Sequence, residues 1–138
     1  MAATPEEKVR QSLIQVMTQE LGYPPGGISL EKRLKEMPHI NLSSKMIPSR
    51  RADIIIFAKD IHPQHAYYPL LLIECKAVPL NEKVVRQVVG YNQFVNAYYI
   101  AVANQTEIRL GWYQEAQQDY RFISSLLPYK SLLVLCQA

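Results

Sequence analysis

Two carboxylates and an amine stand at the ends of two strongly apolar segments of this sequence. Asp53 directly precedes the apolar run 54–57, whereas Glu74 and Lys76 follow the apolar run 70–73. Side chains of a strand alternate between its two faces, so Glu74 and Lys76 are expected on one face. If the two runs form adjacent antiparallel strands, all three charged groups meet at one end of a sheet. The two carboxylates would then provide oxygen ligands for a hard divalent cation.

The composition indicates one globular domain that spans residues 1–138. The chain has 138 residues, of which 49% are hydrophobic, and this length suffices for one core. It contains no apolar run long enough to span a bilayer and no signal-peptide pattern, so we expect a cytoplasmic protein. Its two cysteines are too few for a disulfide framework and are expected to be reduced. The net charge of +3 permits an anionic partner without requiring one.

The elements that must position these groups follow from hydrophobic spacing and from turn residues. Helices are expected over residues 5–21, 81–96 and part of 124–138, where Pro128 would break the last one. Strands are expected over residues 28–34, 51–58, 70–76, 98–103, 108–113 and 120–123. Residues 28–34 also fit a short helix, and residues 59–69 are expected to form a hairpin loop. This order, αβββαβ with further C-terminal strands, indicates an α/β or α+β fold with a mixed sheet flanked by helices.

Five segments, taken in this order, resemble the PD-(D/E)XK nuclease superfamily. Within it, the chain resembles the N-terminal nuclease domain of type I restriction enzyme R subunits, from Pro5 to about Leu110. The last segment matches the Gln-x-x-x-Tyr motif of RecB-like members. The segments are Pro5-Glu6-Glu7 with Val9-Arg10, Leu21-Gly22-Tyr23-Pro24, Arg51-Ala52-Asp53, Glu74-Cys75-Lys76-Ala77, and Gln87 with Tyr91.

Two features depart from that family. Ala52 stands where the nominal motif has proline before the aspartate. The sequence also contains no Walker A glycine loop and no helicase motor. We therefore expect a stand-alone domain with the restriction-endonuclease-like fold rather than a complete restriction subunit.

The resemblance implies roles for the charged residues at the strand ends. Asp53 and Glu74, together with the backbone carbonyl of Cys75, would hold Mg²⁺ or Mn²⁺. Lys76 would position or deprotonate a water molecule, or stabilise negative charge in the transition state, and we favour the electrostatic role. The thiol of Cys75 is expected to point away from this site and to pack as a small hydrophobe.

The resemblance also implies an acidic residue on the first helix. Glu7 matches it, with Glu6 and Glu20 as alternates. Glu7 also lies three residues after Thr4, which is the spacing of a capping box, so it is equally explained as a residue that starts the helix.

Gln87 and Tyr91 lie four residues apart and therefore share one face of a helix. The resemblance implies that they brace Lys76, the attacking water or a phosphate. A solvated glutamine and a core tyrosine are the simpler alternatives.

The charged residues have structural alternatives as well. Asp53 could start a strand and pair with Arg50 or Arg51, and Glu74 with Lys76 could form an exposed cross-strand pair. A surface pair, however, has no reason to follow four consecutive apolar residues.

The function that the resemblance implies is a metal-dependent nuclease that acts on DNA. The alternative is a nuclease-fold module that binds nucleic acid or a partner protein without cutting, and a homodimeric junction-resolving enzyme also fits the size. Scattered basic residues could contact phosphates, or could simply be solvated. They are Lys45, Arg50, Arg51, Lys83 and Arg86.

Overall fold

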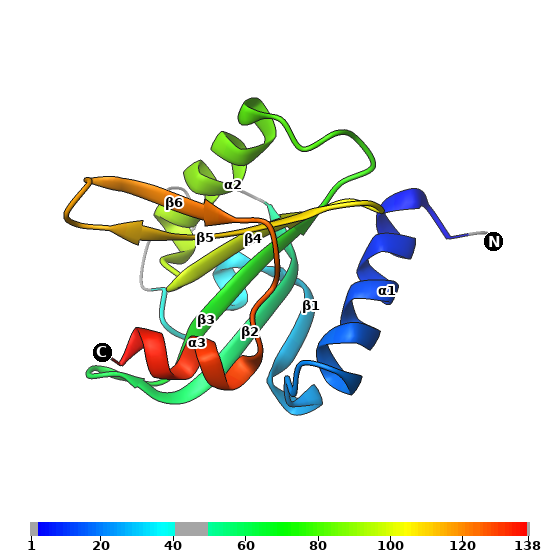
Figure 1. The fold of residues 1–138 in the computed structure, drawn as a ribbon. Coiled ribbons are helices and arrows are strands. Elements are labelled where there is room, and N and C mark those ends of the chain that lie inside the picture. The colour runs from blue at the N-terminus through cyan, green and yellow to red at the C-terminus, as the bar shows by residue number, and fades with distance from the viewer. Residues whose placement is uncertain (1–2, 41–49, 138) are drawn as a thin grey trace.

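A six-stranded mixed sheet with helices on both faces forms the centre of the computed structural model, which describes residues 3–40 and 50–137 (Figure 1). Neighbouring strands are antiparallel except β3 and β4, which are parallel because a helix connects them. The mixed sheet flanked by helices confirms the predicted fold class. In spatial order the strands are β1 (Ile28–Arg33), β2 (Arg51–His62), β3 (His65–Cys75), β4 (Tyr99–Ala103), β5 (Ile108–Gln114) and β6 (Asp119–Ile123).

Each face of the sheet carries its own hydrophobic core. Helices α1 (Pro5–Gln19) and α3 (Tyr129–Cys136) cover one face, and α2 (Glu82–Val95) covers the other (Figure 1). Successive residues of β2 alternate between the cores, so Ile54 belongs to the first and Ile55 to the second. This burial on both faces explains why β2 and β3 read as continuous apolar runs.

The helix starts follow the predicted caps. The Thr4 hydroxyl accepts the backbone N–H of Glu7 at 3.2 Å, and Asn81 accepts that of Val84 at 3.0 Å. Helix α1 ends at Gln19, slightly before the predicted end. Short 3₁₀ turns, η1 (Pro25–Gly27) and η2 (Leu34–Glu36), flank β1. Residues 28–33 are therefore a strand, and a helical turn occurs only at its end.

The predicted loop over residues 59–69 is wrong. Strands β2 and β3 continue through most of it, and the turn itself lies at residues 63–64. A shift in register on β2 lies near Asp60, whose φ of 60° marks a bulge. A second shift lies opposite Pro69, where the ladder is interrupted. These two irregularities let strands accommodate residues that resemble a loop in the sequence.

The last helix also differs from its prediction. Pro128 does not break a helix but caps the start of α3, because its fixed φ of −58° suits that position and it needs no N–H partner there. No helix of the described residues is long and apolar enough to cross a membrane.

Candidate active site

Strands β2 and β3 place Asp53 and Glu74 beside each other. The register pairs Ile54 with Ile73, so Asp53, which precedes Ile54, and Glu74, which follows Ile73, lie at the same end of the two antiparallel strands. The carboxyl group of Asp53 lies close enough to that of Glu74 to raise the pKa of Glu74. The structure thus brings together the two acidic residues that the sequence singled out.

Glu74 is a buried carboxyl group with an open oxygen. The residue is only 3% exposed, and its Oε1 has no hydrogen-bond partner among the described residues. Burial, and after it the neighbouring Asp53, raise the pKa of Glu74 to about 8, although Arg50 and Lys76 oppose the shift. Glu74 is therefore protonated near neutral pH, and its open oxygen is available to a cation that replaces this proton.

Arg50 links Glu74 to helix α2. One guanidinium nitrogen lies 3.6 Å from Glu74 Oε1, and the guanidinium carbon lies 4.4 Å from the centre of the Tyr91 ring. The Tyr91 hydroxyl donates to the backbone carbonyl of Arg50 at 3.4 Å. Tyr91 is 4% exposed, and burial raises its pKa to about 12. Tyr91 is thus both a core residue and the platform for Arg50.

Asp53 also faces a small pocket below α1. Its Oδ2 accepts the backbone N–H of Cys75 at 2.8 Å, which holds the carboxylate at the end of β3. The pocket has a volume of about 190 Å³, and its lining includes Glu6, Glu7 and Arg10 of α1. Helix α1 therefore brings acidic side chains to the same pocket as Asp53.

The other predicted residues differ in how close they lie to this pair. The positive charge of Lys76 lowers the pKa of Glu74. The backbone N–H of Lys76 donates to the backbone carbonyl of Ala103 at 2.8 Å. Gln87 is exposed on α2, one turn before Tyr91. Glu20 caps the opposite end of α1 from Glu7, so the structure does not bring it to the pocket.

The thiol of Cys75 belongs to the core below α1. Burial raises its pKa to about 12, so it remains protonated and inert at neutral pH. Cys75 lies on the side of the sheet that α1 covers, and Asp53 lines the pocket on that same side. Glu74 and Cys75 therefore follow the alternation between faces, whereas Asp53 does not.

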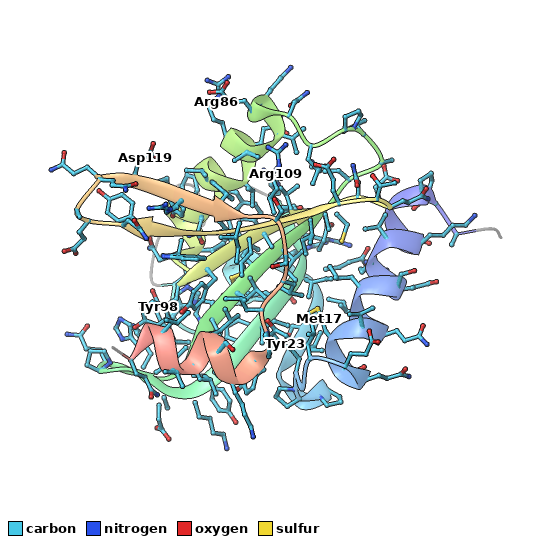
Figure 2. All side chains as sticks on the ribbon, in the orientation of Figure 1. Met17, Tyr23, Arg86, Tyr98, Arg109 and Asp119 are labelled. Carbon is cyan, nitrogen blue, oxygen red and sulfur yellow. The ribbon has the colours of Figure 1, made fainter. Side chains whose placement is uncertain are left out.

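The basic residues that were candidates for phosphate contacts are dispersed. Arg51 and Lys83 are exposed, and Arg86 extends outward from α2, where it pairs with Glu82 at 3.5 Å (Figure 2). Lys45 lies outside the described residues. Arg50 alone among the described members of this set contacts the carboxylate pair. Residue spacing could not single out Arg50 from the other basic residues, because its partners Glu74 and Tyr91 lie on other elements.

A divalent cation fits the chemistry of these donors. Among the residues in the described ranges, no group of three or more His, Cys, Asp or Glu side chains is arranged to hold a metal ion. Magnesium, however, commonly takes only one or two protein carboxylates. A cation would provide a partner for the open oxygen of Glu74 and would replace the proton that its raised pKa retains.

Comparison with known proteins gives one match. The family model described as the N terminus of type I restriction enzyme R proteins matches residues 5–128. This range includes α1, all six strands, α2 and each of the site residues described above. No curated protein and no solved structure matches the chain.

Proposed function

Because the chain belongs to the family of type I restriction enzyme R protein N termini, we propose that it is a metal-dependent nuclease domain of the PD-(D/E)XK type that hydrolyses DNA phosphodiester bonds. The observation that carries this proposal is the contact between Asp53 and the buried carboxyl group of Glu74. Two carboxyl groups in contact oppose each other's ionisation, which costs stability in an empty site. Titratable groups perturbed by both burial and a charged partner are typical of functional sites.

Asp53 and Glu74, with the backbone carbonyl of Cys75, would hold Mg²⁺ or Mn²⁺. When bound, such a cation lowers the pKa of a water molecule and offsets charge on the phosphate oxygens. Asp53 is oriented for this task by the N–H of Cys75. Glu7, which lines the same pocket, adds negative charge that favours a cation over an anion there.

Lys76 supplies fixed positive charge beside the carboxylate pair. Its ammonium is close enough to Glu74 to lower the pKa of that carboxyl group. A preorganised cation stabilises the negative charge that develops on the phosphoryl oxygens during hydrolysis. Gln87, exposed one turn before Tyr91, is suited to hold a phosphate or a water molecule at the edge of the site.

The proposal is tested by incubating the purified protein with supercoiled and linear DNA in Mg²⁺, Mn²⁺ or EDTA. We expect cleavage with either cation and none with EDTA. Asp53→Asn should lose both cleavage and the rise in melting temperature that the cation causes. Asp119→Asn is the matched control, because Asp119 is exposed at the start of β6 and takes part in none of the described contacts of the pair (Figure 2).

Cleavage by Asp53→Asn at the rate of the parent would contradict the assignment of the site. DNA binding by the parent without any cleavage would instead favour the non-cutting binding module.

A further inference from the structure

Arg50 has an arrangement that the proposed reaction does not yet use. Its guanidinium carbon lies over the Tyr91 ring, 4.4 Å from the ring centre, and one guanidinium nitrogen lies 3.6 Å from Glu74 Oε1. The side chain is 39% exposed, whereas that of Glu74 is 4% exposed. One side of the guanidinium therefore rests on protein, and another side reaches solvent at the mouth of the site.

Within residues 3–40 and 50–137, the guanidinium of Arg50 makes no hydrogen bond. A guanidinium has five N–H donors in a fixed plane, and stacking on a ring leaves the donors along its edge free. The approach to Glu74 at 3.6 Å is an ion pair rather than a short hydrogen bond. The free edge matches the two oxygens of a phosphate, which arginine binds in bidentate fashion.

We propose that Arg50 is a phosphate-binding residue whose availability depends on the cation, an inference that rests on the proposed function. In the cation-free protein the guanidinium of Arg50 lies beside the carboxyl group of Glu74. A divalent cation that replaces the proton of Glu74 would repel the guanidinium from this position. Arg50 then binds a backbone phosphate of the DNA, while the Tyr91 ring keeps it at the site.

The coupling has a direct thermodynamic consequence. If the cation frees Arg50 for DNA, then the cation and DNA bind with positive cooperativity, and each raises the affinity of the other by the same factor. Most of the contribution of Arg50 to DNA affinity should therefore appear only when the cation is present.

The test compares the DNA affinity of the parent, Arg50→Gln and Arg51→Gln by fluorescence anisotropy of a labelled duplex, in Ca²⁺ and in EDTA. Calcium is used because its larger and looser shell supports binding with little cutting. Arg51 is the matched control, because it is the exposed neighbour and loses the same charge. In Ca²⁺, Arg50→Gln should weaken binding about tenfold, the effect of a charged hydrogen bond, and Arg51→Gln about threefold or less. In EDTA, the two losses should be similar and small.

Two further variants separate stacking from charge. Arg50→Lys keeps the charge but not the planar fork, so in Ca²⁺ it should recover only part of the loss. Tyr91→Leu removes the ring over which the guanidinium lies, so in Ca²⁺ it should weaken DNA binding in the same direction as Arg50→Gln. Melting temperatures measured in parallel show that each variant is folded.

Equal losses for Arg50→Gln and Arg51→Gln in Ca²⁺ would overturn the inference, and so would a loss for Arg50→Gln of the same size in EDTA. If the parent nevertheless cuts DNA with Mg²⁺, only this inference fails. If Ca²⁺ and Mg²⁺ change neither the melting temperature nor the DNA affinity of the parent, the cation site itself is wrong, and both proposals fail.

Discussion

Glu74 owes its unusual chemistry to its position at the end of a buried strand. Residues 68–75 of β3 are buried, so the carboxyl group that follows Ile73 has little access to water. Burial disfavours its charged form, and the neighbouring Asp53 adds to that effect. The nearby positive charges of Arg50 and Lys76 reduce the penalty without removing it. Glu74 thus holds a proton near neutral pH, and in the proposed function a cation would replace it.

This position predicts a specific pH dependence of stability. The folded protein keeps the Glu74 proton up to a pKa of about 8, whereas the unfolded chain releases it near 4.5. Between these values the folded state binds more protons, so the free energy of unfolding falls as the pH rises. Relative to Glu74→Gln, the parent should lose about 2–4 kcal/mol between the two ends of this window. Urea denaturation in the absence of divalent ions, at several pH values, measures the difference.

Glu74→Gln keeps the size of the side chain and lacks the titration, so its own pH profile is the reference. A constant difference between parent and variant across this window would mean that Glu74 is ionised in the folded protein, contrary to its burial.

The residues of the site differ in how far the sequence revealed them. Asp53 and Glu74 were recognisable because a carboxylate adjoining a continuous apolar run has no ordinary surface role. The contact of Arg50 with Tyr91 was not recognisable, because it joins the residue before β2 to the third turn of α2. The spacing of residues within one helix or strand does not predict a contact between two different elements. The position of Asp53 on the α1 side likewise depends on the bond from Cys75.

At the scale of elements, the β2–β3 hairpin and helix α2 hold the site between them. Helix positions followed well from the sequence, since Thr4 and Asn81 cap the helices in the predicted way. The hairpin did not, because the polar and proline-containing segment 59–69 resembles a loop, and two bulges allow it to remain paired. Local propensity reports what a segment prefers alone, and strand pairing overrides it here.

Asn92 fastens α2 to the sheet, and its loss should destabilise the whole domain. The residue is 2% exposed, accepts the backbone N–H of Ala97 at 2.9 Å, and donates to the Ala97 carbonyl and the Tyr120 hydroxyl, each at 3.1 Å. Asn92→Ala leaves buried polar groups without partners, which should cost about 2–4 kcal/mol of unfolding free energy. Chemical denaturation measures this cost.

The neighbouring exposed residue provides the control, since Gln93→Ala should change stability by less than about 0.5 kcal/mol. If both substitutions have the same small effect, the hydrogen bonds of Asn92 do not secure the helix.

At the scale of the whole molecule, one sheet carries the site at the ends of its central strands, with α1 and α2 approaching from opposite faces (Figure 1). The net charge of +3 is modest, and the exposed basic residues are spread over several elements. In the proposed function such a surface would contact the DNA backbone, and none of the described helices and strands forms a motif that reads base edges.

DNA binding should therefore depend strongly on salt and weakly on sequence. Each phosphate contact releases counterions, so the logarithm of the association constant should fall linearly with the logarithm of the salt concentration. Anisotropy titrations of two unrelated duplexes, from about 50 to about 200 mM salt, measure both effects. A preference of more than about a hundredfold for one duplex would contradict the expectation, because it would require direct base contacts.

The central claim is that the Asp53–Glu74 pair and Lys76 form a hydrolytic site, and single-turnover cleavage with Mg²⁺ at saturating DNA tests it most directly. Lys76→Ala removes a charge beside the carboxylates without removing a ligand, so DNA affinity should stay close to that of the parent. Its cleavage rate should fall about 10²–10³-fold, as for the loss of one preorganised electrostatic contact. Lys83→Ala, on the exposed start of α2, should cut at nearly the parental rate. Cleavage by Lys76→Ala as fast as by the parent would contradict the account.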